Sequence, residues 1–165
     1  MSEEIGGFKC GAVHAYRWDG LAKSEEVVGG SSLLRRSVSF EWEGRLEPTV
    51  KEASQYFGHS VAVAVRGGGG ASAGAEYVAV GAPQEKDDGV GIAGSGYATA
   101  GGGALVTANG GVWVYGGRPL VLSAHVKAPV AVTSQRFGWS VSFGGGGVLA
   151  IGSQLDCTMH VVDVW

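Results

Sequence analysis

Runs of glycine constrain this chain more than any other feature of its sequence. Of its 165 residues 31 are glycine, and they gather in runs at 67–70, 101–103 and 144–147. A glycine in a helix interior costs about 1 kcal/mol relative to alanine, so a helix does not pass through such runs. The apolar segments between the runs are short and rich in Val, Tyr and Trp, which favours strands. The sequence therefore predicts an all-β protein.

Alternation of apolar and polar residues predicts nine short strands. They fall at 11–18, 37–42, 57–65, 76–82, 111–115, 119–126, 137–143, 148–152 and 159–164. Helical periodicity is weak throughout the chain. The segment 21–28 (LAKSEEVV) is the best helical candidate, but Gly29-Gly30 follows it, so we expect a loop or a single turn there.

One pattern of residues occurs twice. Phe57-Gly58-His59-Ser60-Val61 opens one alternating strand, and Phe137-Gly138-Trp139-Ser140-Val141 opens another. In both copies an apolar-Ala-apolar-Gly line follows, and then an alternating strand that ends in an aromatic residue. The segment 11–20 (GAVHAYRWDG) matches the third line of this pattern alone. A repeated β-unit is therefore predicted, and a repeat of this kind decides the fold.

The first copy resembles the FG-GAP repeat, the blade unit of integrin-α-type β-propellers. Phe57-Gly58 is followed by Val78-Ala79-Val80-Gly81-Ala82-Pro83 and by Gly111-Val112-Trp113-Val114-Tyr115. The second copy keeps Phe137-Gly138 but has Gly152-Ser153-Gln154 where the family has Gly-Ala-Pro. The resemblance implies four-stranded blades arranged around an axis, commonly about seven of them.

On this basis residues 1–165 form a single β-propeller fragment of about two and a half blades. We expect a partial blade at 11–42, one blade at 57–126 with a glycine-rich insertion at about 84–110, and a blade at 137–165 without its outer strand. Such an incomplete propeller cannot close and leaves strand edges unpaired. Because the chain begins and ends on the same type of strand, identical copies do not complement one another. We therefore expect the remaining blades of a longer chain, or a protein partner.

No metal or cofactor is expected. Many blades of the family hold calcium in a D-x-D-x-D-G loop between their first two strands, but 66–75 (RGGGGASAGA) contains no carboxylate at that position. Cys10 and His14 share one face of a strand, whereas Cys157 and His160 do not. Neither pair has the paired spacing of a zinc site, so both cysteines are expected to be free thiols.

The candidate binding residues are Glu85, Asp87 and Asp88, together with Gln154 and Asp156. The resemblance implies that loops leaving the second strand of each blade lie on the ligand face, and both groups occupy such loops. The alternative for the acidic group is an ordinary solvated turn. His59 is expected to be a packed or edge histidine.

No catalytic residue is predicted. The chain lacks G-x-S-x-G, and the glycine-rich segment 91–103 has no strand–helix context for a nucleophile or a dinucleotide. The net charge of −3 and the absence of a basic cluster argue against nucleic acid. No apolar run reaches the roughly 18 residues of a membrane span. The N-terminus has no signal-peptide pattern, although the resemblance implies an extracellular or cell-surface setting, so the compartment stays open.

The leading functional hypothesis is a non-catalytic protein-recognition or scaffold module that uses propeller loops and strand edges. The resemblance, rather than the spacing of residues, suggests adhesion-like binding. One alternative is an accessory propeller segment of a larger enzyme, as in phospholipase-type proteins. Another is a structural subunit of a large assembly.

Overall fold

A computed structural model describes residues 4–5, 8–28, 31–49, 51, 55–65, 76–86, 109–128, 134–155 and 159–163. These residues form strands and one short 3-10 helix, Gly145–Gly147, with no α-helix among them. The predicted all-β class is therefore confirmed. None of the described segments is a helix long and apolar enough to cross a membrane. The chain divides into two compact units, Met1–Val13 with Glu47–Trp165, and His14–Leu46.

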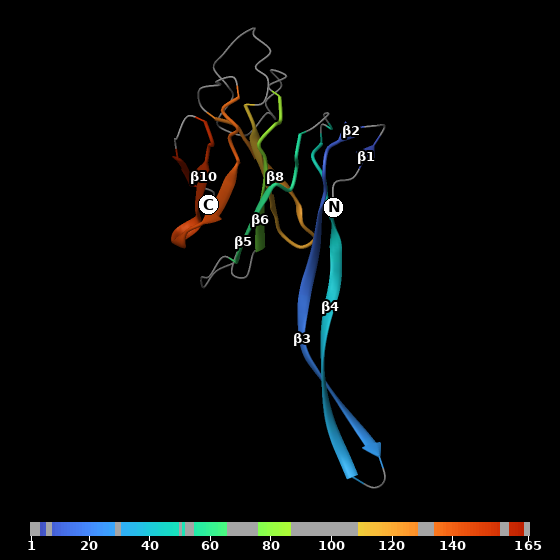
Figure 1. Cartoon of the computed structure of the whole chain (residues 1–165). Helices are drawn as coiled ribbons and strands as arrows, with labels where there is room; N and C mark the ends of the chain where they lie inside the picture. Colours follow the sequence, from blue (N-terminus) through green and yellow to red (C-terminus); the bar gives the residue numbers. More distant parts are fainter. Residues whose placement is uncertain are drawn as a thin grey trace. The chain divides into compact units, whose positions relative to one another are not determined.

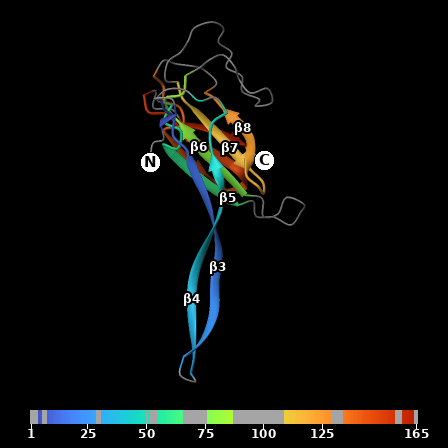
Figure 2. The ribbon, with the colours of Figure 1, turned by 90° about the vertical axis from the view of Figure 1, so that its right-hand side faces the viewer.

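The larger unit contains a four-stranded antiparallel sheet in which each strand pairs with the next along the chain (Figure 2). Its strands are β5 (Ser60–Val65), β6 (Glu76–Ala82), β7 (Gly111–Gly116) and β8 (Val121–Val126). All six residues of the central strand β7 are buried, which explains its nearly continuous apolar sequence. The edge strand β5 alternates, and it leaves Val61, Val63 and Val65 exposed.

A second, three-stranded sheet packs on the first. It consists of β9 (Ser140–Phe143), β10 (Val148–Gly152) and β11 (Met159–Asp163), with β10 in the middle. The core between the sheets joins Ala79, Val112, Val114, Val126 and Ala128 of the first sheet and its flank to Phe137, Leu149 and Ile151. Full burial of a Leu or Ile side chain is worth about 1.5–3 kcal/mol, so this core holds the two sheets together.

The two Phe-Gly pairs lie in turns of the same geometry. In each turn the backbone N–H of the Phe donates to the carbonyl of a residue that lies shortly before a strand. Phe57 donates to Cys10, before β3 (Val13–Val28), at 2.9 Å, and Phe137 donates to Asn109, before β7, at 2.8 Å. Gly58 and Gly138 have φ angles of +88° and +83°, in the left-handed region that side chains disfavour. The repeated sequence pattern therefore has one repeated backbone geometry.

The smaller unit consists almost entirely of a two-stranded hairpin of β3 (Val13–Val28) and β4 (Ser31–Leu46) (Figure 1). The expectation of a loop or helical turn at 21–28 is wrong, because these residues belong to β3. Backbone pairing with a partner strand needs no apolar periodicity, and the Gly-Gly sequence at 29–30 is as typical of a two-residue hairpin loop as of a helix end. Arg17 forms an ion pair with Glu43 between these strands.

The larger unit also contains two short strands near the N-terminus, β1 (Glu4–Ile5) and β2 (Phe8–Lys9), which pair with each other.

Candidate functional site

The carboxylate of Glu85 points into the protein. Strand β6 ends at Ala82, and the N–H of Glu85 donates to the Ala82 carbonyl at 3.1 Å, which turns the chain back over the end of the sheet. The residue is only 5% exposed. The alternative of a solvated turn is therefore wrong for Glu85, because polar side chains inside the protein bind its carboxylate.

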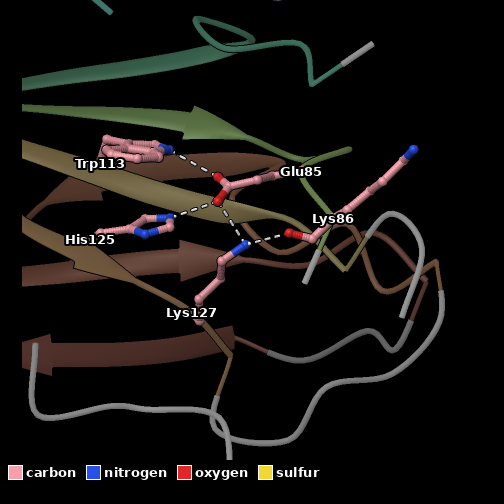
Figure 3. Close-up of polar contacts among 5 residues, drawn as sticks. All are labelled: Glu85, Lys86, Trp113, His125 and Lys127. Carbon is pink, nitrogen blue, oxygen red and sulfur yellow. Dashed lines mark hydrogen bonds and ion pairs between the residues drawn. The ribbon is translucent and has the colours of Figure 1, made fainter. Parts of the chain in front are cut away.

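These partners come from the two following strands (Figure 3). Trp113 Nε1 on β7 donates to Glu85 Oε2 at 2.9 Å, and Lys127 Nζ forms an ion pair with Oε1 at 2.8 Å. His125 Nε2 on β8 lies 2.9 Å from Oε1, although its N–H is not aligned with that oxygen. Lys127 also donates to the backbone carbonyl of Lys86 at 3.2 Å. The ends of three neighbouring strands are thus joined through one carboxylate.

The cluster has little room to spare. The rings of His125 and Trp113 stack with centroids 3.9 Å apart at an angle of 18°. A Cβ atom on Gly111 would lie 2.5 Å from Glu85 Oε2 and 2.9 Å from His125 Nε2. Glycine at position 111 is therefore required for the carboxylate and the imidazole to occupy these places.

Electrostatics keep Glu85 ionised. Burial alone raises the pKa of this carboxyl, but the contacts with His125 and Lys127 outweigh it and lower the pKa to about 2. Burial also raises the pKa of Tyr115, as do the charges of Glu47 and Glu85, and its hydroxyl donates to the Glu47 carbonyl at 2.6 Å. A paired, buried carboxylate stabilises the end of the sheet and presents no oxygen to a ligand outside.

A second group of side chains gathers at the Phe-Gly turns. The rings of His59 and Trp139 lie 4.3 Å apart, and the Arg136 guanidinium carbon lies 5.6 Å from the Trp139 ring centroid. Arg136 also donates to Gln154 Oε1. Tyr56, on the same turn as His59, is 50% exposed. We call these five residues, Tyr56, His59, Arg136, Trp139 and Gln154, the turn surface.

The predicted binding residues therefore differ in their surroundings. Glu85 is buried among cations, whereas Gln154 is exposed and bound by Arg136. Asp87, Asp88 and Asp156 lie outside the described residues, as do Cys157 and the segment 66–75 where the family has its calcium loop. Cys10 is a buried free thiol. In the described part of the chain, no three His, Cys, Asp or Glu side chains converge as metal ligands.

Two signals in the sequence point to the residues that were missed. His125 and Lys127 are two apart at the end of a strand, so they share a face and offer two possible cations to an acid on a neighbouring loop. Arg136 and Trp139 occupy the same positions of the second Phe-Gly turn as Tyr56 and His59 do in the first. Because the four residues occupy equivalent positions of two turns, the repeat predicts that they lie on one surface.

Comparisons of the chain with protein-family models, with curated proteins and with solved structures find no match. The fold and the site together define an all-β protein of packed antiparallel sheets, with a buried carboxylate cluster and an aromatic and cationic turn surface. The resemblance to FG-GAP repeats rests on the residues of the two repeated copies.

Proposed function

We propose that this chain is a non-catalytic protein-recognition module built from FG-GAP-like propeller blades, and that the turn surface contacts its protein partner. The observation that carries the proposal is that Trp139 contacts His59 of the other Phe-Gly turn and Arg136 of its own turn. Trp, Tyr and Arg dominate the residues that contribute most to protein–protein affinity. The turn surface holds one of each.

Preorganisation favours such a role. The N–H of Trp139 donates to the Arg136 carbonyl at 3.2 Å, and the N–H of His59 donates to the Tyr56 carbonyl at 3.1 Å, so both turns have a fixed backbone. Side chains that are already ordered lose less entropy when a partner binds. An affinity gain is therefore expected from the arrangement itself, in addition to the area that the rings bury.

The loop that contains Glu85 is hydrogen-bonded, through the neighbouring residue Gln84, to the residue before Tyr56 of the turn surface. The N–H of Gln84, next to Glu85, donates to the Gln55 carbonyl at 3.3 Å, and Gln55 directly precedes Tyr56. The loop that the buried carboxylate anchors is thus bonded to the first Phe-Gly turn. We assign Glu85 a positioning role and the turn surface the contact role.

A displayed library of random peptides tests the proposal with the 165-residue chain as the immobilised target. Selected peptides are expected to bind the wild-type chain and to lose about tenfold or more in affinity with Trp139→Ala or Arg136→Ala, the loss typical of a central contact. Val121→Ala, at an exposed residue of β8, is the matched control and should bind as the wild type does. Selection of no peptide, or equal binding by Trp139→Ala, would contradict the proposal, provided that thermal unfolding shows each variant folded.

A further inference from the structure

A hydrogen bond joins the two sheets alongside their apolar core. Ser60 Oγ donates to the carbonyl oxygen of Gly138 at 2.8 Å. A Cβ atom on Gly81 would lie 2.1 Å from the same oxygen, so only glycine leaves room for it. Around this hollow Val112 and Val114 are fully buried by the second sheet. The Phe-Gly turn of one sheet is thus recognised by a serine, a glycine and apolar neighbours of the other.

The second sheet carries the same arrangement on its own outer face. In the first sheet Gly81 pairs with Ser60 and Val112, and Ala79 pairs with Val114. In the second sheet Gly152 pairs with Ser140 and Met159, and Ala150 pairs with Val161. The equivalent positions are therefore Ser60 and Ser140, Ala79 and Ala150, Gly81 and Gly152, Val112 and Met159, and Val114 and Val161.

In the second sheet three of these positions, Ser140, Met159 and Val161, are exposed, and Ala150 and Gly152 are partly buried. Met159 is 71% exposed and Val161 is 61% exposed, whereas their equivalents Val112 and Val114 are both at 0%. The three atoms nearest to a Cβ built on Gly152 all belong to Ser140, at 2.3, 3.7 and 3.9 Å. At Gly81 the nearest atom is the Gly138 carbonyl oxygen of the second sheet, and none of the three atoms nearest to Gly152 comes from another sheet.

We propose that the outer face of β9–β10–β11 docks a partner protein whose β-sheet opens on a Phe-Gly-x-Ser turn. The glycine carbonyl of the partner accepts a hydrogen bond from Ser140 Oγ, and apolar side chains of the partner cover Met159 and Val161. A second copy of this chain is not the expected occupant, because its Gly138 carbonyl already accepts a hydrogen bond from Ser60 and its other Phe-Gly turn is already bonded to Cys10 through Phe57. This inference does not rest on the proposed function, since it uses Ser140, Gly152, Met159 and Val161 and none of the five residues of the turn surface.

An extended chain supplies the partner's sheet at high local concentration. In the extended chain a copy of residues 117–163 follows Asp163 directly and supplies the partner's sheet. Asp163 is the chosen point because it corresponds in register to Gly116, after which residues 117–163 follow in the natural sequence: Gly116 pairs with Tyr77, and Asp163 pairs with Val148. The copied Met159 is replaced by Leu, which leaves Met1 and Met159 as the methionines. The rate of Met159 oxidation by hydrogen peroxide is followed by mass spectrometry, with Met1 as the internal reference. The matched control is the same extended chain with the copied Phe137→Asp.

Met159 should oxidise quickly in the 165-residue chain, about tenfold or more slowly in the extended chain, and quickly again with the copied Phe137→Asp, because oxidation needs solvent access. An unchanged rate in the extended chain, or equal protection with the Asp control, would overturn the proposal. Protection that grows with the concentration of the 165-residue chain would overturn it too, because a second copy would then be the occupant.

A second measurement keeps the test open to failure if the extended chain folds poorly. Ser140→Ala should lower the melting temperature of the extended chain, and Ser60→Ala should lower that of the 165-residue chain, because each removes the hydrogen bond to a Phe-Gly turn. In the 165-residue chain Ser140→Ala should leave the melting temperature unchanged. Equal effects of Ser140→Ala in both chains would show that the serine has only a local role, and the proposal would fail.

Discussion

The carboxylate of Glu85 stabilises the end of the four-stranded sheet because it neutralises a cation that is itself buried. Lys127 is 6% exposed and forms its ion pair with Glu85 Oε1. Removing one partner of a buried pair typically costs about 3–5 kcal/mol, since the other charge stays buried without compensation. Glu85→Gln should therefore lower the free energy of unfolding by about 3 kcal/mol, measured by urea denaturation at neutral pH.

Glu76→Gln is the matched control for this substitution. Glu76 forms an ion pair with Arg118, whose side chain is 55% exposed to solvent. Exposed ion pairs contribute only about 0–1 kcal/mol, so the control should lose less than the Glu85 variant. Equal losses at both positions would mean that burial does not strengthen the Glu85 pair.

The same pair makes stability depend on pH. The pKa of Glu85 is lowered from 4.5 to about 2 in the folded chain. A lowered pKa adds stability that is complete above pH 4.5 and is lost as the pH falls toward 2, by about 3 kcal/mol in all. Urea denaturation between pH 6 and pH 2 should show this decline in the wild type and a flatter curve for Glu85→Gln. Parallel curves would assign the acid sensitivity to other groups.

The Phe-Gly turn at residues 137–138 packs against the first sheet. Substitution of its glycine tests this contact between the sheets. Gly138 combines a φ of +83° with a close approach, since its Cβ would lie 2.5 Å from the Gly111 carbonyl oxygen. Gly146 has a φ of +72° but nothing within 4 Å, and Gly145 has open space and no positive φ. We expect Gly138→Ala to lower the melting temperature most, Gly146→Ala to cost about 1 kcal/mol, and Gly145→Ala to have no effect.

The order of these three effects is the informative result. Gly146→Ala isolates the conformational penalty, so any further loss in Gly138→Ala measures the close contact between the sheets. If Gly138→Ala is no more destabilising than Gly146→Ala, the turn does not pack against the first sheet as described.

The division of the chain into two units predicts two levels of stability. The unit His14–Leu46 is a two-stranded hairpin, and such hairpins are marginal without a third strand or a covering layer. Amides of β3 and β4 within this unit should therefore exchange with solvent by local opening, well before those of β6 and β7, which are buried between neighbours. Hydrogen exchange followed by mass spectrometry measures the difference. Equal protection would show that the two units unfold together.

The sequence was sufficient for the features that depend on local chemistry. Glycine runs and alternation indicated the all-β class, and the two Phe-Gly lines indicated turns that have the same backbone geometry at Gly58 and Gly138. The strand at 21–28 was missed because its pairing depends on β4 rather than on its own residues.

The burial of Glu85 depends on groups that lie far away in the sequence. Lys127 and His125 come some forty residues later, and only the pairing of β6, β7 and β8 brings them to the carboxylate. Close to Glu85 the sequence offers Asp87 and Asp88, and three acids together favour a solvated turn. Gln154 was chosen as a loop residue, but its contact with Arg136 follows from the packing of β9 and β10.

The dependence of the first sheet on a later turn gives the order in which the chain must assemble during synthesis. The face that bears Ala79, Val112 and Val114 is complete once β8 has been made, but its cover, from Phe137 to Ile151, does not yet exist. At a synthesis rate of about 5–20 residues per second, that face stays open for roughly one to a few seconds. We therefore expect a stage during synthesis in which the first sheet exposes apolar surface that the second sheet later covers.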